Sequence, residues 1–391
     1  MNNYRPFWSV FERIPKRTGF GDETLLSVYR EYGVIRKSDR DDNHNRTGKS
    51  LDDYQLVEQG DLVFNKMKAW QGSLGISEMR GIVSPAYFVY RPLVEFNSRF
   101  MHHLLRSSAS IDFYAAHSKG IRVNQWDLEP EQLNQMEVYF PPAGTQRRIA
   151  EYLDKETNEI DRLVGELDEY IELLEKRKDK VLIDGTKILD KDTPTTRLGW
   201  HASVELGKTI QGEQKSPADV LQKYVRAGNI QPDGRFEGEE KTMWFTPKES
   251  EIYSLKKGDV LIVEGGAGFG RSLTLEKDLV NWGFQNHIIR VRPDNGWDSK
   301  FIDYVIRAYK AAGYIDLLTV GATIPGFSSE KAKKLKVPFL TLEEQEEIVQ
   351  DISRELSETN RIVEECTELK KILLKRRQVL ITDVVTGKVE V

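Results

Sequence analysis

The sequence predicts a mixed α+β protein in which two similar globular domains are joined by two long antiparallel helices that pack as a coiled coil. Three observations support this fold class: a repeat at an offset close to 199 residues, an apolar heptad late in each copy, and strand-like runs in the rest of each copy. The predicted parts are a first domain at 1–145, a first long helix at 146–193, a second domain at 194–342 and a second long helix at 343–391.

The repeat is clearest where segment 136–156 aligns with segment 335–355. In this register the matching pairs are Val138 and Val337, Phe140 and Phe339, Gln146 and Gln345, and Ile149 and Ile348. Further upstream, the resembling segments are GDLVFNK (60–66) and GDVLIVE (258–264), and YFVYRP (87–92) and IIRVRP (288–293). Each copy therefore holds a strand-rich part followed by a long helix.

The predicted domains contain many aromatic residues and short β-like runs bounded by Gly, Asn, Asp or Pro, which is typical of strands in a mixed sheet. Short helices are expected at 98–117 and at 300–318, which occupy equivalent places in the two copies. This equivalence favours two homologous α/β domains. Segment 191–197 is the best candidate for the boundary between the first helix and the second domain.

Each predicted long helix carries apolar residues every seven positions, which indicates a coiled-coil seam. The seam residues are Leu153, Ile160, Leu167, Leu174 and Val181 in the first helix and Ile352, Cys366, Leu373 and Leu380 in the second, with Thr359 at its polar position. A companion stripe contains Ile149, Leu163 and Tyr170, and then Ile348, Ile362 and Leu369. A helix of about 40 residues is about 60 Å long, so its narrow stripe needs a long partner, which the chain itself contains. A generic dimerisation arm is the alternative.

The overall composition leaves nucleic-acid binding open. The 391 residues carry a net charge of −5, but the four predicted parts carry 0, −4, +3 and −4, so the acidity lies in the helices. The single cysteine excludes an internal disulfide framework and a multi-cysteine zinc site. We find neither a run of about 18 apolar residues nor a secretion leader, so we expect a cytoplasmic protein without a membrane segment.

No segment of the sequence has the pattern of a catalytic site. GGAGFGRS (265–272) is similar to a phosphate loop, but Arg271 replaces the usual lysine and the strand-like run SLTLEKD follows. We interpret it as a glycine-rich hairpin or a DNA-facing loop. YFPPAG and VSPAY do not match the motif of methyltransferases that act on exocyclic amines, and the histidines are too scattered to predict a metal site.

Polar and basic side chains are concentrated in predicted loops, and these are the residue types that contact DNA phosphates and base edges. The candidates are Arg36, Lys37, Arg40, Asn43, Asn45, Arg46, Lys49, Lys66, Lys68, Gln71, Arg122, Asn124 and Gln125 in the first domain, and Lys208, Gln211, Lys215, Arg226, Asn229, Arg271, Gln285 and Asn286 in the second. Each loop could instead be only solvated. The duplication favours DNA, because two pseudo-symmetric domains on a rigid spacer suit a two-part duplex site.

The layout resembles the specificity subunits of type I restriction–modification systems over essentially the whole chain. The similarity rests on GDLVF and GDVLI, and on VYFPPAGTQRRIAEYLD (138–154) and VPFLTLEEQEEIVQDI (337–352), which are similar to the start of the family's long helices. VGATIPGFSSEKAKKLKV (320–337) is similar to the stretch that precedes that start. The first copy departs from the pattern at Thr145, where the second has Glu344 before its glutamine.

The resemblance implies two target recognition domains that read a bipartite, asymmetric DNA sequence, one half per domain, with the helices as a ruler between the halves. It implies that methyltransferase subunits, two in number, dock on the chain and modify an adenine in each half with S-adenosylmethionine. Motor-nuclease subunits join where restriction accompanies modification. Catalysis then belongs to the partners, and the chain itself is expected to be no enzyme and to bind neither a cofactor nor a metal.

Two other functions stay open from the sequence. A coiled-coil scaffold without DNA specificity would show no saturable preference among duplexes at moderate salt. An enzyme that uses 265–272 as a nucleotide loop would respond to ATP or GTP in a thermal melt.

Overall fold

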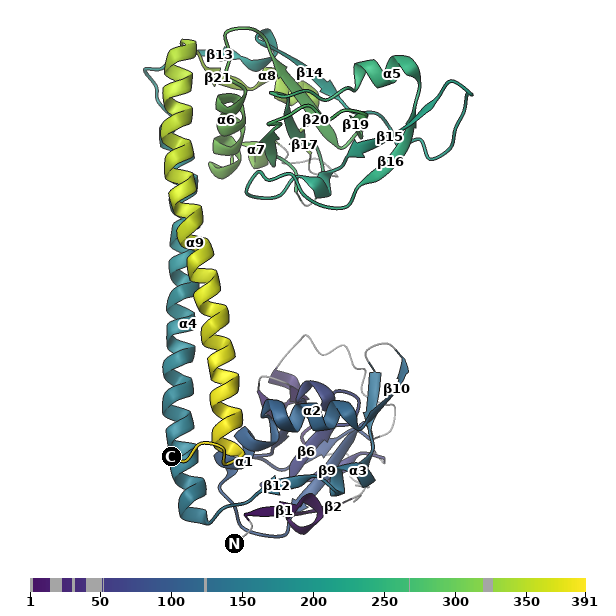
Figure 1. The fold of residues 1–391 in the computed structure, drawn as a ribbon, viewed down its shortest axis with the longest axis vertical. Coiled ribbons are helices and arrows are strands. Elements are labelled where there is room, and N and C mark those ends of the chain that lie inside the picture. Colours follow the sequence, from purple (N-terminus) through teal and green to yellow (C-terminus); the bar gives the residue numbers. More distant parts are fainter. Residues whose placement is uncertain are drawn as a thin grey trace. The chain divides into compact units, whose positions relative to one another are not determined.

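The computed structural model describes residues 3–14, 23–29, 32–39, 51, 53–122, 125–266, 268–318 and 326–391. The chain forms two compact units: unit 1 comprises 1–167 and 367–391, and unit 2 comprises 168–366. Each unit contains a globular part and a segment of each of two long helices, α4 (Ala143–Gly185) and α9 (Leu342–Val385) (Figure 1). The boundary between the two units therefore falls inside each long helix, after Leu167 in α4 and after Cys366 in α9.

Unit 1 begins with short strands and 3-10 turns and adds helices towards α4. Its strands are β1 (Tyr4–Pro6), β2 (Phe11–Arg13), β3 (Leu26–Tyr29), β4 (Gly33–Arg36), β5 (Gln55–Val57), β6 (Leu62–Asn65), β7 (Leu74–Ile76), β8 (Gly81–Val83), β9 (Tyr87–Pro92), β10 (Ser118–Arg122), β11 (Gln125–Leu128) and β12 (Glu137–Tyr139). Its helices before α4 are α1 (Ser98–Leu105), α2 (Ser108–Ala116) and α3 (Pro130–Asn134), with 3-10 turns η1 (Phe7–Ser9), η2 (Lys37–Asp39) and η3 (Ala69–Gln71).

Unit 2 follows the same order. Its strands are β13 (Thr195–Arg197), β14 (Ala202–Leu206), β15 (Val220–Val225), β16 (Lys241–Phe245), β17 (Val260–Val263), β18 (Ser272–Thr274), β19 (Trp282–Phe284), β20 (Ile288–Pro293) and β21 (Lys336–Pro338). Its helices before α9 are α5 (Pro247–Ile252), α6 (Ser299–Ala311), α7 (Tyr314–Leu317) and α8 (Ser329–Lys334), with η4 (Leu198–Trp200) and η5 (Ala227–Asn229).

The two globular parts share one antiparallel frame. The central sheet has the order β2-β9-β6-β7 in unit 1 and β14-β20-β17-β18 in unit 2. Outside it, β1 pairs with β12 and β13 pairs with β21, in both cases just before a long helix begins. The additional strands differ, since unit 2 has a three-stranded sheet β16-β15-β19 and unit 1 has the pairs β3-β4, β5-β8 and β10-β11. The predicted mixed fold class, with two similar domains and two long helices that run in opposite directions, is confirmed.

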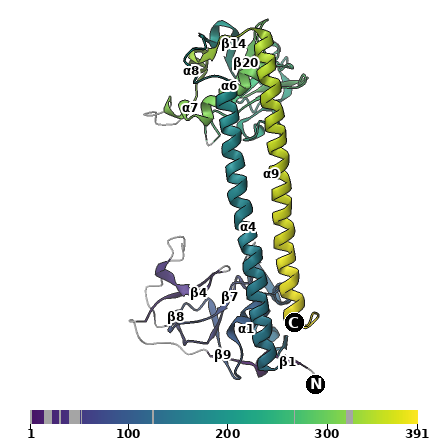
Figure 2. The same ribbon diagram turned by 90° about the vertical axis from the view of Figure 1, so that its left-hand side faces the viewer.

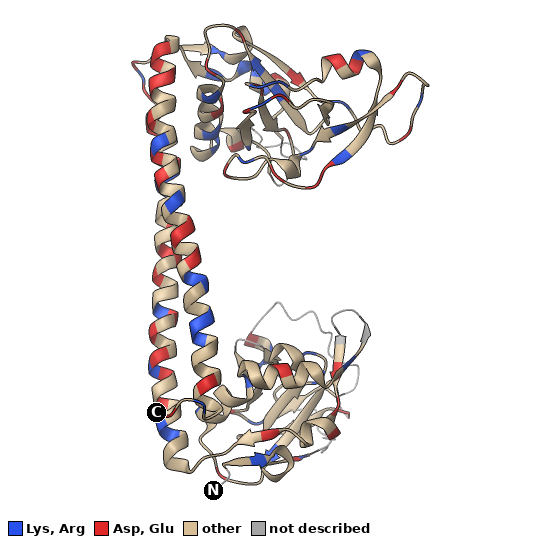
Figure 3. Cartoon of the chain, in the orientation of Figure 1, with Lys and Arg blue, Asp and Glu red and all other residues tan. Residues whose placement is uncertain are grey.

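Within each unit the α4 and α9 segments run side by side in opposite directions (Figures 1 and 2). In unit 1, Arg377 Nη2 donates to Asp161 Oδ2 at 3.1 Å. In unit 2, Lys178 Nζ donates to Asn360 Oδ1 at 3.0 Å. These are equivalent pairs at the 199-residue offset, so the repeat extends to contacts between the helices. Acidic and basic residues are interleaved along both helices (Figure 3), as on a solvated face.

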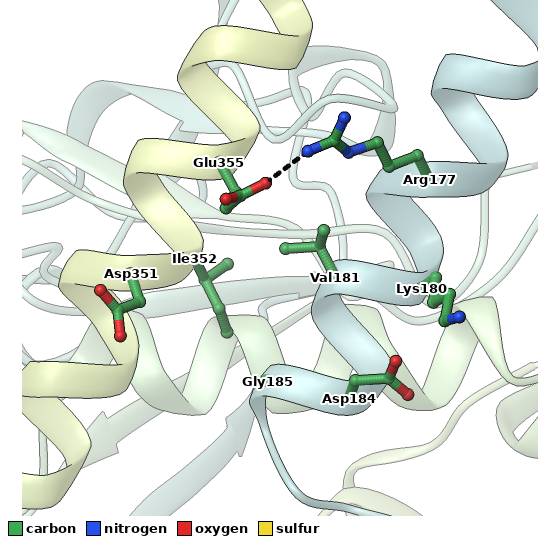
Figure 4. A pocket seen from close by; sticks show the side chains of 8 residues that line it. All are labelled: Arg177, Lys180, Val181, Asp184, Gly185, Asp351, Ile352 and Glu355. Atoms are coloured by element: carbon green, nitrogen blue, oxygen red, sulfur yellow. Dashed lines mark hydrogen bonds and ion pairs between the residues drawn. The ribbon is translucent and has the colours of Figure 1, made fainter.

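Figure 4 shows the helix pair in unit 2, where Val181 and Ile352 face each other and Arg177 Nη2 donates to Glu355 Oε2 at 2.9 Å. Ile352 is buried, and a Cβ added at Gly185 would lie 2.8 Å from Ile352 Cγ1. The helices can therefore approach this closely only because residue 185 is a glycine and has no side chain.

The seam residues differ in burial along the helices. Leu153, Ile160, Leu174 and Ile352 are buried, whereas Leu167, Val181, Cys366, Leu373 and Leu380 are half-buried. The polar Thr359 is also buried, and its hydroxyl donates to Glu355 O at 2.8 Å. In the companion stripe, however, Tyr170 and Leu369 are 46% and 47% exposed. Their predicted place in the packed face is wrong, because two helices alone bury only the narrow stripe along which they touch.

The Gly-Asp dipeptide of each copy lies at an equivalent position in the two units. Asp259 is fully buried, and its carboxylate accepts from Arg292 Nε at 2.6 Å and from the Lys256 amide at 2.8 Å. Asp61 of unit 1 accepts from Arg91 Nε at 3.3 Å and from the Glu58 amide at 2.9 Å. In both units the aspartate thus connects the turn before one central strand to an arginine near the end of the neighbouring strand.

The repeated glutamine at the start of each long helix is buried in both units. Gln345 Oε1 accepts from the Asp298 amide at 2.9 Å, and its Nε2 donates to Leu340 O at 3.0 Å. Gln146 makes the same two contacts, with the Asn97 amide at 2.9 Å and with Pro141 O at 2.8 Å. The side chain therefore ties the start of the long helix to the N-cap residue of α6 or α1.

We expect Gln345→Ala to lower the free energy of unfolding of unit 2 by about 1–3 kcal/mol, because a buried amide and a buried carbonyl lose their partners. Denaturant unfolding of the full chain measures this. Gln350→Ala is the matched control, since Gln350 lies on the same helix and is exposed. Equal stability of the two variants would show that the buried contacts of Gln345 contribute nothing.

Candidate nucleic-acid interface

The predicted DNA-contacting residues of unit 1 lie in several different segments. Arg40, Asn43, Asn45, Arg46, Lys49 and Asn124 lie outside the described residues. Arg36 ends β4 and is exposed, and Lys37 begins η2. Arg122 and Gln125 are register partners in the β10–β11 hairpin.

In unit 1 the structure brings two of the predicted loops together. Trp70 of the segment 66–72, named here the Trp70 loop, stacks on Trp126 of β11, with ring centroids 5.1 Å apart. Lys66 Nζ lies 4.0 Å from Asp127 Oδ2. Lys68 is exposed. Neither tryptophan was among the predicted contacts, although Trp70 is next to Gln71 and Trp126 is next to Gln125 in the sequence.

Gln71 and Gly72, at the end of the Trp70 loop, line a cavity of about 230 Å³ against α1, α2 and α9. Gly72 has a φ of +79°, and a Cβ there would lie 3.1 Å from Ile111 Cδ1. The loop therefore turns tightly onto α2 at a position that favours glycine. The Trp70 loop thus has two sides. Lys66 and Lys68 lie on one side, and Gln71 lines the cavity on the other.

In unit 2, Lys208 and Gln285 are brought together by a parallel β-bridge but are both buried. Lys208 forms an ion pair with Glu249 and donates to Gln211 Oε1 at 3.0 Å. Gln211 Nε2 donates in turn to Asp219 Oδ2 at 3.0 Å. This arrangement contradicts the prediction that Lys208 and Gln285 contact DNA directly, because both side chains are buried.

The structure corrects the prediction for Asn229 as well. Asn229 is buried, its Oδ1 accepts from the Arg226 amide at 3.0 Å, and its Nδ2 donates to Glu237 O at 3.1 Å. Arg226 Nη2 lies 3.0 Å from Glu239 Oε2. Asn229 therefore shapes the turn at η5 and is not available to bases. Lys215 is exposed and Asn286 is half-buried.

The glycine-rich segment 265–272 connects β17 to β18 as a hairpin. The Gly270 amide donates to Val263 O at 2.8 Å, and Gly266 and Gly270 have positive φ values. Strand β18 follows directly, so a phosphate loop, which needs a helix at this point, is excluded. Arg271 of the hairpin lines a cavity of about 740 Å³ whose wall contains both basic and acidic side chains.

In unit 1, His102 lies on α1, and burial together with the charge of Arg106 lowers its pKa to about 4. In the unfolded chain His102 takes up a proton near its ordinary value of 6.5, whereas the folded chain does not. The stability that depends on neutral His102 is therefore fully present above about pH 6.5. It is lost as the pH falls towards 4.

We expect unit 1 to lose up to about 3 kcal/mol of its free energy of unfolding between pH 6.5 and pH 4 through His102. Denaturant unfolding at several pH values, with His102→Gln beside the unchanged chain, measures this contribution. The variant should show a weaker pH dependence in this window. The same slope in both proteins would contradict the buried, neutral state of His102.

Residues 203–372 match the family described as the type I restriction modification DNA specificity domain. The matched segment contains most of unit 2 and the first part of α9. A curated relative, the type I restriction enzyme StySPI specificity subunit of Salmonella potsdam, is 25% identical over 282 residues. The chain is thus similar to type I restriction–modification specificity subunits, and residues 203–372 carry the similarity to their DNA specificity domain.

The aligned part covers 68% of this chain and 59% of that family member. A second curated relative, from Haemophilus influenzae, is 26% identical over 272 residues, which cover 66% of its length. The chain thus spans less than two thirds of the length of either specificity-family relative.

Solved structures of the family have the same fold. A chain from a structure on complex assembly and conformational transition of the type I R-M system gives a TM-score of 0.75 at 15% identity, covering 99% of this chain and 98% of that one. The HsdS subunit from Thermoanaerobacter tengcongensis gives a TM-score of 0.56 at 15% identity, covering 99% of this chain and 97% of that one.

Two absences hold for the residues that the structure describes. No helix in them combines the length and the apolar character that crossing a membrane requires. Their His, Cys, Asp and Glu side chains do not gather in a group of three that could hold a metal ion.

Proposed function

We propose that this chain is the DNA-reading, non-catalytic subunit of a type I restriction–modification assembly and that it recognises a bipartite, asymmetric site, one half per unit. The observation that carries the proposal is a shared frame with different loops. Both units use the same sheet order and the same buried aspartate and glutamine contacts. Around this frame they present different side chains, as expected if each unit reads its own half-site.

The surface chemistry of the loops supports this role. The Trp70 loop of unit 1 presents Lys66 and the exposed Lys68. Lysine contacts phosphates and guanine edges, and aromatic rings pack on sugars and bases. In unit 2 the remaining predicted contacts are the exposed Lys215 and the half-buried Gln211, Arg226, Arg271 and Asn286.

Catalysis is assigned to partners in this proposal. Two methyltransferase subunits would dock on the chain, bind S-adenosylmethionine and methylate adenine at N6 in each half-site. Motor-nuclease subunits would join for restriction. The long helices, each of which is unbroken from unit 1 into unit 2, would set the spacing between the recognised halves. The match of residues 203–372 to the DNA specificity domain and the name of the Salmonella potsdam relative support these roles.

The proposal is tested by selecting bound duplexes from a random library with the chain in complex with the methyltransferase subunit of the same genome. We expect a sequence split into two parts by an unspecified spacer. The scaffold alternative predicts that a folded complex retains duplexes without sequence preference, and that result would overturn the proposal.

Lys66→Ala should relax the selected sequence in one half only, at a cost of about 1–3 kcal/mol in specific binding. The comparison of target with unrelated duplexes is the internal control. Equal loss on both kinds of duplex would show that Lys66 anchors a phosphate and reads no base.

A further inference from the structure

Unit 2 brings together three segments that are far apart in the sequence. They are 207–215, 224–229 and 284–287, and they hold all of the DNA-contacting residues predicted for unit 2 except Arg271. The first segment follows β14, and the other two contain the ends of β15 and β19, which pair in parallel (Figure 1). Because the three segments meet, a side chain that fixes them also fixes the surface that unit 2 presents to DNA.

Lys208 lies at the junction of these segments. Its amide donates to Phe284 O at 3.0 Å, and its carbonyl oxygen accepts from the Asn286 amide at 2.9 Å. The Gln285 amide, between these two contacts in the sequence, donates to Val225 O at 3.0 Å. The main chain of Lys208 is therefore held by the segment after β19, which is held in turn by the end of β15.

The ammonium group of Lys208 begins a chain of polar contacts. The side chain is 8% exposed, forms an ion pair with Glu249 and places Nζ 5.3 Å from the centroid of the Phe245 ring. Nζ also donates to Gln211 Oε1 at 3.0 Å, and Gln211 Nε2 donates to Asp219 Oδ2 at 3.0 Å. The contacts therefore run from a buried lysine, through a half-buried glutamine, to a buried aspartate.

Asp219 closes the segment 209–218, named here the 209–218 loop. Its Oδ2 also accepts from the Lys215 amide at 3.0 Å and from the Ser216 amide at 3.1 Å. The pKa of the Asp219 carboxyl lies below its ordinary value, mainly because the Lys215 amide donates to it. The loop contains neither helix nor strand, and its exposed side chains include Gln214 and Lys215. Its shape therefore depends on these side-chain contacts.

The ion pair of Lys208 and Glu249 contributes more to shape than to stability. Removing an ammonium group and a carboxylate from water costs free energy that largely offsets their attraction, so a buried pair adds little net stability. A fully hydrogen-bonded polar network can instead specify one conformation, because its donors and acceptors match in one geometry. In unit 2 that geometry places the ammonium group where it reaches Gln211.

We propose that Lys208 is a positioning residue for DNA reading by unit 2. It holds the 209–218 loop so that Gln214 and Lys215 meet base edges of the half-site that unit 2 reads, and it does not touch DNA itself. Glutamine and lysine are side chains that hydrogen-bond adenine and guanine edges in the major groove. The inference rests on the proposed function, because it requires unit 2 to read a half-site.

Hydrogen exchange of the full chain without DNA tests whether Lys208 holds the loop. The variant combines Lys208→Met with Glu249→Gln, so neither charge of the pair is left alone, and the new amide oxygen can still accept from the Thr246 amide. We expect faster exchange in peptides that cover the 209–218 loop and unchanged exchange in the central sheet of unit 2. Unchanged exchange in the loop overturns the positioning role.

Lys223→Met is the matched control. Lys223 Nζ lies 2.6 Å from Glu240 Oε2 and 5.6 Å from the centroid of the Trp282 ring, so this variant also loses an ion pair and an aromatic contact. Both contacts lie outside the 209–218 loop, and we expect the loop to exchange as in the unchanged chain. Faster exchange in the control would show that the loop responds to the loss of any lysine, and would overturn the specific role of Lys208.

Selection of duplexes from a random library by the methyltransferase complex tests the effect on DNA reading. We expect the double variant to broaden the base preference in one half only and to lose about 10-fold of its preference for target over unrelated duplexes, as for one good base contact. Gln211→Leu removes the next contact and leaves the ion pair in place, so it should broaden the same positions even where the double variant does not fold. Lys223→Met should select the unchanged sequence.

The outcomes separate the role of Lys208 from the proposed function. If the unchanged complex selects a split sequence and the double variant and Gln211→Leu select it equally well, the proposed function stands and the positioning role is overturned. Relaxation of both halves, or equal weakening on all duplexes, also overturns it, because the substitutions then act on stability or assembly. If the unchanged complex has no sequence preference, the proposed function fails and the role of Lys208 in reading fails with it, whereas the exchange result still decides whether Lys208 holds the loop.

Discussion

Asp259→Ala is expected to lower the free energy of unfolding of unit 2 by about 3–5 kcal/mol. The carboxylate is fully buried and accepts two hydrogen bonds from the Arg292 guanidinium, at 2.6 and 2.7 Å, and one from the Lys256 amide. Its removal leaves Arg292 of the inner strand β20 without this ion pair and removes the hydrogen bond that holds the turn before β17. Denaturant unfolding of the full chain, followed by the fluorescence of tryptophans in unit 2, measures the loss.

Asp278→Ala is the control for this substitution, because Asp278 is exposed and also accepts from a backbone amide, that of Lys257 at 2.8 Å. We expect it to change stability by less than about 1 kcal/mol. Asp61→Ala in unit 1 should cost less than Asp259→Ala, since its arginine contacts are longer, at 3.3 and 3.4 Å. Similar stability of the Asp259 and Asp278 variants would contradict the role of the buried pair.

The second large effect is expected from a charge in the helix seam. Ile352→Asp places a carboxylate at a site that is 2% exposed, within the apolar core formed by α4, α9 and α6. A buried charge without a partner costs several kcal/mol, so we expect unit 2 to unfold at much lower denaturant concentration. Leu153→Asp, at the equivalent position of unit 1, should do the same to its own unit.

Leu369→Asp controls for the Ile352 substitution, because it makes an apolar-to-acidic change on the same helix at a side chain that is 47% exposed. We expect a change of less than about 1 kcal/mol. Thermal melting and helix content by circular dichroism distinguish the variants. If Leu369→Asp destabilised the chain as much as Ile352→Asp, Leu369 of the companion stripe would have to be packed against the partner helix, which would contradict its exposure.

The fold was largely predictable because its signals are local and repeated. The heptads, the strand-like runs and the matched segments each depend on neighbours in sequence, and they led to the two long helices and the paired domains. Tyr170 and Leu369 show the limit of this reasoning. Periodicity places them beside the seam, but burial also needs a third packing partner, such as the globular cores that cover Leu153 and Ile352.

The candidate interface was less predictable, because the same residue types hold loops together and contact DNA. Lys208 was selected for its charge, but its partner Glu249 is 41 residues away, and sequence composition does not reveal that pairing. Asn229 is likewise fixed by carbonyls of a later segment.

Modified-base sequencing tests the central claim most directly. Cells that express this chain with the methyltransferase subunit of the same genome are compared with cells that express the methyltransferase subunit alone. We predict a split sequence with methylated adenine in both halves, present only with the chain. A folded complex that produces no new methylated sequence, or one without two separated parts, would contradict the account.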